Sequence, residues 1–481
     1  MTTPPMNIEV RKRLREVEQE IVVRAPEHDI DPTLARVRAL VEVLGDPQLA
    51  YPVIHVTGTN GKTSTTRMIE RLLMELGLRT GRFTSPHLHD IRERIVLSGE
   101  PVEAERFIAA YDDLAPLLAI VEARCLESGL GRLSFFEILV ALGYAIFADA
   151  PVDVAVVEVG LGGTWDATNV ANGSVAVIAP IAVDHARYLG SEVELIAGEK
   201  AGIIKPEAIV VSAAQEPVVL EVLRERSGEL GVSLVVDIGS VDDGTDGGAG
   251  DREDSTRAAQ GPAVDSAEIA VLTRDIAVGG QVLTLRGLAG DYPDLFLALH
   301  GEHQAHNALV ALAAVEAFIG GGQQPLDIDV VRAAFAAVTS PGRLEIVRRS
   351  PTVLVDAAHN PAGVASLVAA LEDAFVFTRT IGLFACMADK DVEGMLVQLE
   401  PVLDEIVITR TTSMRAMDPE RLGALAREYF SDDRVHVVAS LPDALDRAAE
   451  LADTEGGVGG GVIATGSVFV AAEVRALLGA A

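Results

Sequence analysis

One segment near the N-terminus constrains this chain more than any other. Residues 53–64 read VIHVTGTNGKTS, and a helical pattern continues from there to Leu76. An apolar β-branched run, a glycine turn and a helix, in this order, form the context of a phosphate-binding loop. The segment therefore predicts a nucleotide site between a strand and a helix.

The residue types in this loop suit a phosphate ligand. Its two glycines let backbone N–H groups close around phosphate oxygens, and the helix N-terminus adds its dipole. Lys62 is expected to reach the β- and γ-phosphates, and Thr63 or Ser64 to offer a hydroxyl to magnesium. The loop departs from the G-x-x-x-x-G-K-[ST] pattern, because Val56 occupies the first glycine position. A simple turn between strand and helix is the alternative interpretation.

Lysine is scarce in the sequence. Among 39 lysines and arginines, only Lys12, Lys62, Lys200, Lys205 and Lys390 are lysines. Arginine keeps a fixed charge, whereas a lysine amine can lose its proton and react. The bias marks Lys62, Lys200 and Lys390 as candidates for amine chemistry, whereas drift explains Lys12 in an arginine-rich helix.

Composition indicates a globular protein and excludes several classes. A chain of 481 residues corresponds to two to four domains at roughly 150 residues each. No apolar run reaches the roughly 18 residues of a membrane helix, and the N-terminus lacks a signal-peptide pattern, so we expect no membrane partner. The net charge of −32 argues against nucleic acid as a partner. Cys125 and Cys386 lack metal-ligand spacing and fit a reduced cytoplasm.

Apolar runs alternate with helical patterns along most of the chain. Residues 6–45 look helical, with a loop at 26–32, and another helical pattern covers 135–149. The runs 152–159, 174–181 and 208–213 are rich in Val, Ile and Ala, which is typical of buried parallel strands. This alternation predicts a doubly wound α/β fold.

A change of composition and a turn signal divide the chain further. Residues 238–264 are rich in Gly, Asp and Ser and predict a flexible insertion, and a strand-like pattern follows at 269–285. Residues 339–343 (TSPGR) predict a linker. A second α/β set is expected beyond it, with strands at 353–356, 380–384, 405–409, 435–438 and 461–465. The predicted domains are therefore 1–338 and 344–481.

Polar side chains end several of the predicted strands. Glu158 closes an apolar run and precedes three glycines, and His185 follows the next run. Magnesium prefers oxygen ligands and takes only one or two from protein, so Glu158 is a candidate ligand. His185 is a second candidate, because neighbouring strand ends converge. A solvent-exposed glutamate and a structural histidine are the alternatives, and Ser85, which precedes a proline, is by itself a turn signal.

Two further groups carry less specific signals. Lys200 lies at a helical end before a predicted strand, and a buried neutral amine can add carbon dioxide to form a carbamate that serves as an oxygen ligand. Asp356 and His359 follow the first strand of the second domain and can face the cleft between the domains. Asp389-Lys390-Asp391 forms another polar cluster, for which a solvated turn is the alternative.

Taken together, these motifs resemble one family. The motifs are TGTNGK (57–62), TSPHL (84–88), EVGLGG (158–163), DATN (166–169), Asp184-His185, EKAGI (199–203), HQ-x-x-N (303–307), PGR (341–343) and D-x-x-HNP (356–361). In this order, from about residue 28 to Ser467, they resemble dihydrofolate synthase/folylpolyglutamate synthase of the Mur ligase superfamily. The resemblance implies a P-loop-containing, Mur-ligase-like N-terminal domain that binds ATP and pteroate, and a smaller Rossmann-like C-terminal domain that serves as the glutamate ligase domain.

The resemblance also implies roles for individual residues. It places Thr59, Asn60, Gly61, Lys62, Thr63, Ser64, Asn307, Arg343 and Asp356 at ATP, and Ser85, Glu158, His185 and carbamylated Lys200 at Mg²⁺. It places Asp31, Ser134, Phe135, Phe136, Glu137, Trp165, Asp166 and Ala167 at the pteroate substrate. His359 is expected to help place the incoming glutamate, and Lys62, Lys200, His185 and His359 form the predicted catalytic set.

Two positions depart from the family pattern as we understand it. Thr63 stands where many members have glycine, which gives a Lys-Thr pair as in Mur ligases. Thr164 stands where the family usually has arginine, directly before Trp165. The missing cation leaves open the affinity and choice of substrate, because a charged hydrogen bond contributes about 1.5–3 kcal/mol.

The implied reaction is ATP-dependent ligation of L-glutamate to dihydropteroate, to reduced folates, or to both, through an acyl phosphate. ATP and Mg²⁺ are the expected cofactors, and a cytoplasmic monomer is the expected form. A Mur-type ligase of peptidoglycan precursors is one alternative. A binding protein that uses ATP as a switch is another, and it would release no ADP in response to glutamate.

Overall fold

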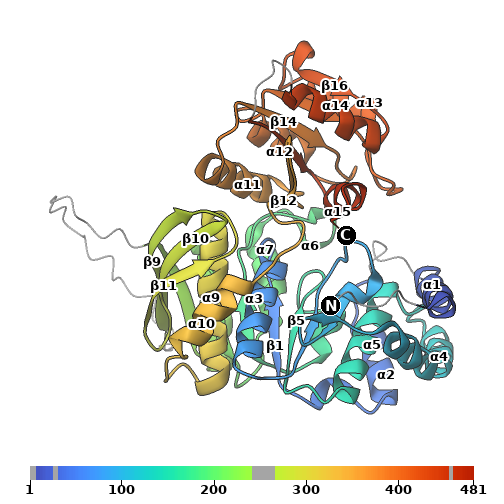
Figure 1. Ribbon diagram of the computed structural model, residues 1–481. Helices are drawn as coiled ribbons and strands as arrows, with labels where there is room; N and C mark the ends of the chain where they lie inside the picture. Colours follow the sequence, from blue (N-terminus) through green and yellow to red (C-terminus); the bar gives the residue numbers. More distant parts are fainter. Residues whose placement is uncertain (1–6, 25–30, 241–265, 454–458, 481) are drawn as a thin grey trace.

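The structure is a computed structural model that describes residues 7–24, 31–240, 266–453 and 459–480. It is an α/β protein with two sheets, one of 11 strands and one of 6, which confirms the predicted fold class. We call residues up to Ala337 the N-terminal part and residues from Glu345 the C-terminal part. In Figure 1 the C-terminal part, in orange and red, lies above the N-terminal part.

The N-terminal part contains the larger sheet and most of the helices. Its helices are α1 (Ile8–Val22), α2 (Ala35–Val43), α3 (Lys62–Glu75), α4 (Ala104–Glu127), α5 (Phe135–Asp149), α6 (Ala186–Leu189), α7 (Val193–Ala201), α8 (Pro217–Leu230), α9 (Glu302–Gly320) and α10 (Ile328–Ala337). Its strands are β1 (Val53–Thr57), β2 (Thr80–Phe83), β3 (Ile95–Leu97), β4 (Glu100–Pro101), β5 (Val154–Glu158), β6 (Gly173–Ile178), β7 (Ile209–Ser212), β8 (Leu234–Ser240), β9 (Ser266–Ala277), β10 (Gly280–Arg286) and β11 (Asp291–Leu297). Four short 3₁₀ turns occur in the described chain: η1 (Pro47–Leu49), η2 (Ile91–Arg94), η3 (Ala167–Val170) and, in the C-terminal part, η4 (Asp432–Arg434).

The strand order places the first strand in the middle of the parallel region. The order is β11-β10-β9-β8-β7-β6-β1-β5-β2-β3-β4. Strand β1 pairs in parallel with both β5 and β6, and β2 continues the parallel region beside β5. The carboxyl ends of parallel strands meet at one edge of a sheet, so the loops after β2, β5, β1 and β6 lie side by side.

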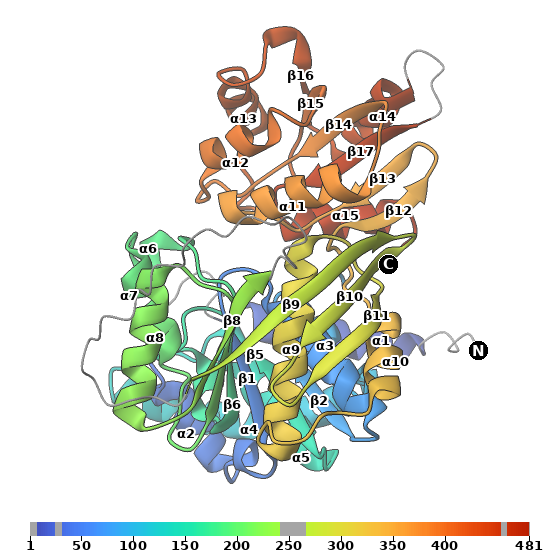
Figure 2. The ribbon, with the colours of Figure 1, turned by 90° about the vertical axis from the view of Figure 1, so that its left-hand side faces the viewer.

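Helices cover both faces of this sheet (Figure 2). Successive strand residues point to opposite faces, and Ile54 and Val56 of β1 pack in one core cluster with α3, α9 and α10. Val53 of β1 packs on the opposite face, in the cluster formed by α1, α2, α4 and α5. A third cluster joins α7 and α8 to β6, β7 and β8. Burial on both faces explains why the strand sequences are almost continuously apolar.

The chain passes to the second sheet between α10 and β12 (Glu345–Arg349), through the segment predicted as a linker. The other strands are β13 (Thr352–Val355), β14 (Arg379–Phe384), β15 (Glu405–Ile408), β16 (Val435–Val437) and β17 (Gly460–Thr465), in the order β12-β13-β17-β14-β15-β16. The helices are α11 (Pro361–Ala374), α12 (Val392–Leu399), α13 (Pro419–Ala426), α14 (Leu441–Asp453) and α15 (Val468–Leu477). We keep the division into two domains at this point as a proposal.

The sequence located most of the parallel strands but fewer of the antiparallel ones. Strands β5, β6 and β7 and all five predicted C-terminal strands form within a few residues of their expected bounds. The strand-like patterns expected at 269–285 are confirmed, because β9 and β10 form an antiparallel pair there. Residues 238–240 of the predicted insertion belong to a strand, because β8 runs to Ser240 and pairs with β9. Residues 241–264 of that insertion lie outside the described residues.

In the described part of the chain, no helix has the length and apolar character needed to cross a membrane.

A buried glutamate fastens the antiparallel strands to α9. Glu316 is 0% exposed. Its Oε2 accepts a hydrogen bond from the backbone N–H of Leu288 (2.7 Å), and its Oε1 accepts from the Tyr292 hydroxyl (2.7 Å) and from the N–H of Ala289 (3.2 Å). Two donors of the β10–β11 connection and one of β11 therefore depend on one carboxylate, and α9 in turn carries Asn307 of the predicted site.

We predict that Glu316→Ala lowers the free energy of unfolding by about 3 kcal/mol, because it leaves buried donors unpaired. Urea denaturation followed by circular dichroism measures this value. The control is Glu225→Ala, which removes an exposed glutamate from α8. Equal stability of the two variants would contradict the role of Glu316.

Candidate active site

A cavity of about 1210 Å³ lies between the two parts and is lined by both. It gathers most of the predicted site residues. Its wall includes Asp31, Thr59, Asn60, Gly61, Lys62, Thr63, Ser64, Ser85, Ser134, Phe136, Glu137, Glu158, Trp165, Asp166, Ala167, His185, Asn307, Arg343, Asp356 and His359. Lys200 lines a separate small pocket that also touches Lys62 and His185. Phe135 lines neither pocket; it is 6% exposed and packs under the guanidinium of Arg94.

The phosphate loop has the backbone shape that its glycines allow. Gly61 precedes the first residue of α3 with φ +83°, a left-handed conformation that glycine adopts without strain. A Cβ at this position would lie 2.6 Å from Oδ1 of Asn307. Any larger residue would therefore displace Asn307, so the loop and α9 approach each other only because residue 61 is glycine.

Two lysine amines meet behind this loop. Lys62 Nζ donates hydrogen bonds to the carbonyl oxygens of Gly58 (3.0 Å) and Thr59 (3.1 Å), and Lys200 Nζ donates to the same Gly58 oxygen (2.8 Å). Burial lowers the pKa of both amines, and for Lys200 burial and the charge of Lys62 bring the pKa to about 7. Lys200 is therefore partly neutral near neutral pH, the form that reacts with carbon dioxide.

Glu158 has the features expected of a magnesium ligand. It is 1% exposed at the end of β5; its Oε1 accepts a hydrogen bond from the Thr63 hydroxyl (3.0 Å), and its Oε2 is buried without a hydrogen-bond partner. Burial raises the pKa of Glu158, although the charge of Lys62 and the Thr63 hydrogen bond act against it. A buried carboxylate oxygen without a partner is costly unless a cation or a proton satisfies it, so these residues fit a metal ion.

The other predicted metal ligands are of different chemical types. Ser85 and His185 line the same cavity as Glu158. In the described residues, no group of three or more His, Cys, Asp or Glu side chains forms a metal site. Magnesium does not need such a group, since it keeps several waters and takes oxygens from substrate phosphates.

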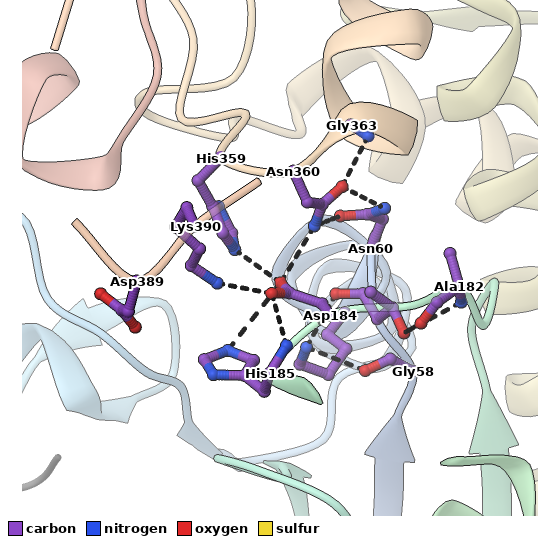
Figure 3. Close-up of polar contacts among 12 residues, drawn as sticks. Gly58, Asn60, Ala182, Asp184, His185, His359, Asn360, Gly363, Asp389 and Lys390 are labelled. Atoms are coloured by element: carbon purple, nitrogen blue, oxygen red, sulfur yellow. Dashed lines mark hydrogen bonds and ion pairs between the residues drawn. The ribbon is translucent and has the colours of Figure 1, made fainter. Parts of the chain in front are cut away.

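A cluster of charged and polar side chains joins the two parts (Figure 3). Lys390 Nζ lies 2.6 Å from Oδ1 of Asp184, and His359 Nε2 lies 3.4 Å from its Oδ2. Burial alone would raise the pKa of Asp184, but the contacts with His359, Lys390 and His185 outweigh it and lower that pKa. Burial and the charge of Lys390 lower the pKa of His185 to about 4, so its imidazole is neutral near pH 7 and suited to a metal ion.

Asn307 and Asp356 shape the ends of the cavity next to the linker. Asn307 Nδ2 donates to Oε1 of Gln304 (3.1 Å), and Ser64 Oγ lies 3.1 Å from Oγ of Ser340 in the linker. Asp356 accepts hydrogen bonds from the backbone N–H groups of Leu344 (2.8 Å) and Ala358 (2.7 Å). Burial raises the pKa of Asp356, against the charge of Arg343. The carboxylate thus fixes the backbone on which Arg343 faces the cavity.

The opposite end of the cavity is built around Arg36. Its Nη1 lies 2.7 Å from Oδ2 of Asp31, and its Nε lies 3.0 Å from Oε1 of Glu137. Glu137 also closes a capping box with Ser134 at the start of α5. Ser134 and Glu137 therefore hold the first turn of α5 as well as lining the cavity.

An aromatic wall completes this end. Phe136 packs where a Cβ on Gly160 would lie 2.5 Å from its ring. Asp166 accepts hydrogen bonds from the N–H groups of Leu161 (2.9 Å) and Thr168 (2.9 Å), which holds the segment that carries Trp165 and Ala167. The cavity wall thus carries a cation at the phosphate loop and aromatic side chains at Phe136 and Trp165.

Comparison with known proteins identifies this arrangement. The family model of the Mur ligase middle domain matches residues 56–315, and that of the Mur ligase glutamate ligase domain matches residues 342–468. The chain is 48% identical to the dihydrofolate synthase/folylpolyglutamate synthase of Mycobacterium tuberculosis, over 97% of this chain and 94% of the relative. The chain belongs to this family.

Solved structures support the assignment. The M. tuberculosis folylpolyglutamate synthase complexed with ADP aligns with a TM-score of 0.88 and 46% identity, over 98% of this chain and 99% of that one. A folylpolyglutamate synthase complex with AMPPCP and folate aligns with a TM-score of 0.77 and 29% identity, over 97% and 99% of the two chains. The protein is therefore an ATP-dependent ligase with the two-part fold of the folylpolyglutamate synthases.

Thr164 directly precedes Trp165, which lines the cavity. The Thr164 side chain is exposed and donates a hydrogen bond to the carbonyl of Glu199 (3.1 Å), and it does not line the cavity. The sequence analysis expected the missing cation at this position to lie beside the substrate pocket. Because the side chain does not line the cavity, we expect residue 164 to have little effect on substrate choice.

Sequence reasoning missed part of the site. It singled out His185 but gave no role to Asp184, and it gave none to Arg36 or Asn360. The scarcity of lysine was a usable signal for Lys390, whose side chain is 8% exposed and paired with Asp184. The solvated turn considered as the alternative for residues 389–391 is therefore wrong for Lys390.

We predict that Lys62→Ala lowers glutamate-dependent ADP release by about 100-fold or more, because it removes a cation from the transferring phosphate. A coupled assay for ADP measures the rate. Lys12→Ala is the control, since the Lys12 side chain is 79% exposed on α1. ADP release by Lys62→Ala near the parental rate would refute this role.

Proposed function

We propose that this ligase joins L-glutamate to dihydropteroate and to the γ-carboxylate of reduced folyl-glutamates, with ATP as the energy source. The single observation that carries the proposal is the cavity itself. Its wall includes both the phosphate loop at Lys62 and the aromatic side chains of Phe136 and Trp165, so it offers groups that suit a triphosphate and groups that suit a flat pteridine and benzoate. The names of the relatives, which include both activities, support the same substrates.

The residues suggest how the amide bond forms. The substrate carboxylate attacks the γ-phosphate of ATP, which gives an acyl phosphate and ADP. Lys62 neutralises the charge that develops on the transferring phosphate. The glutamate amine then attacks the acyl carbon, and inorganic phosphate leaves. Because both parts of the chain line the cavity, their closure holds the reactants together and excludes water.

Magnesium would be held by Ser85, Glu158 and His185 together with phosphate oxygens. When bound, it supplies positive charge to the phosphates. We propose that Lys200 is carbamylated, since its pKa of about 7 leaves a reactive neutral amine. Asn307, Arg343 and Asp356 are proposed to receive the nucleoside end of ATP, and His359 the incoming glutamate.

The proposed form is a cytoplasmic monomer. Cys125 and Cys386 are both free and buried, which suits a reducing compartment.

The central test offers the enzyme ATP, Mg²⁺ and glutamate with dihydropteroate or tetrahydrofolate in separate reactions. We expect ADP release with both acceptors, and products heavier by one glutamate residue in mass spectrometry. Turnover with only one acceptor would restrict the proposal to a single step. Silence with both, but turnover with a peptidoglycan precursor, would favour the Mur-type alternative, and ATP binding without any glutamate-dependent ADP release would favour a nucleotide switch.

We predict that Thr164→Arg changes the KM for either pteridine substrate by less than about twofold, because exposed substitutions outside a site shift free energies by about 0.5 kcal/mol or less. Steady-state kinetics with the two acceptors measure both KM values. A tenfold fall in one of them would instead show that a cation at residue 164 reaches the substrate.

A further inference from the structure

Asn360 makes four hydrogen bonds, which use every donor and acceptor site of its side-chain amide. It is 2% exposed and stands directly before α11, which begins with Pro361. Its Oδ1 accepts from the backbone N–H of Gly363 (2.8 Å) and from Nδ2 of Asn60 (3.2 Å). Its Nδ2 donates to Oδ1 of Asn60 (3.1 Å) and to Oδ2 of Asp184 (3.1 Å). An amide group has two donors and two acceptor sites, so all of them are occupied.

Only one of these four bonds serves the helix. The bond from Gly363 caps α11, and the other three cross to the N-terminal part (Figure 3). Two of them form a reciprocal amide pair with Asn60, a residue of the phosphate loop. The third reaches Asp184, which Lys390 and His359 hold from the C-terminal side. We call Asn60, Asp184 and Asn360 the Asn360 junction.

We propose that Asn360 is a positioning residue, which fastens the C-terminal part to the phosphate loop and so maintains the closed arrangement needed for ligation. The inference rests on the proposed function, because it assumes that both parts must enclose the reactants. Asn360 does not line the cavity, so it acts through Asn60 and Asp184 and not through contact with a substrate.

The chemistry of the junction requires an amide. Aspartate and serine both cap helices well, so a residue that served only α11 could be any of the three. Aspartate would lose both N–H donors and would place a second carboxylate beside Asp184, where like charges repel. Serine has only one donor and a shorter side chain, so it cannot make all of these hydrogen bonds. Replacement of Asn360 by Asp or Ser therefore keeps the cap of α11 but removes hydrogen bonds to the N-terminal part.

The experiment compares Asn360→Asp and Asn360→Ser with Asn7→Asp. Asn7 caps α1 through a hydrogen bond from Glu9 N–H (3.0 Å) at an exposed position, so the control makes the same chemical change at a helix start outside the junction. Small-angle X-ray scattering in the presence of AMPPCP reports the separation of the two parts. Steady-state kinetics report the KM for glutamate, and calorimetry reports nucleotide affinity.

We expect both Asn360 variants to have a larger radius of gyration than the parent and a KM for glutamate raised about tenfold or more, since more than one hydrogen bond is lost. The nucleotide affinity should stay within about twofold, a change of roughly 0.4 kcal/mol, because Lys62 and the loop glycines remain. In the double variant Asp184→Asn, Asn360→Asp, the KM for glutamate should fall part of the way back to the parental value, because a donor and an acceptor again face each other.

Two outcomes would overturn the proposal: a scattering profile and glutamate KM of both Asn360 variants equal to those of Asn7→Asp, or no recovery in the double variant. If Asn360→Asp fails to fold, as a thermal melt would show, the neutral Asn360→Ser decides the question. The scattering measurement needs no turnover. A parent enzyme that closes on nucleotide but ligates no glutamate would therefore count against the proposed function and not against the junction.

Discussion

Two lysine amines share one backbone acceptor, and the site is arranged around that constraint. Lys62 and Lys200 both donate to the carbonyl of Gly58, at 3.0 and 2.8 Å. Two ammonium groups at this separation and burial disfavour each other, so the arrangement is stable only when one amine is neutral or an anion lies nearby. A triphosphate at Lys62 and a carbamate at Lys200 would both supply negative charge. The chain carries a net charge of −32, so its affinity for an anionic substrate depends on this local concentration of cations.

The order of the strands explains why these groups meet. Strands β6, β1, β5 and β2 are neighbours in the sheet, and each ends at the same edge. Their carboxyl ends and the loops that follow supply His185, the phosphate loop, Glu158 and Ser85. Parallel pairing fixes the spacing of the strand ends, so the side chains at those ends lie close together in the folded protein. The C-terminal part then closes the cavity from the other side with His359 and Lys390.

The same geometry sets what the sequence could reveal. A polar residue at the end of an apolar run is visible in the sequence, so Glu158 and His185 were found together with the strands that carry them. The Asp184 contacts were not visible, because Asn360 and Lys390 lie 176 and 206 positions away along the chain and belong to the C-terminal part. Strand β12 was missed for a different reason. It is an antiparallel edge strand whose residues are only partly buried, so it lacks the continuous apolar pattern of a parallel strand.

Asp184 and His185 connect the two halves of the site through one peptide bond. His185 adopts φ +52°, a left-handed conformation that is uncommon for a residue other than glycine. This turn lets Asp184 face Lys390 and Asn360 of the C-terminal part while His185 lines the nucleotide cavity. The strain of such a backbone is about 1–2 kcal/mol, and the local hydrogen bond from the His185 N–H to Asp184, together with the contacts of Asp184 with Lys390 and Asn360, offsets it. Adjacent residues thus contact the C-terminal part and carry the proposed metal ligand.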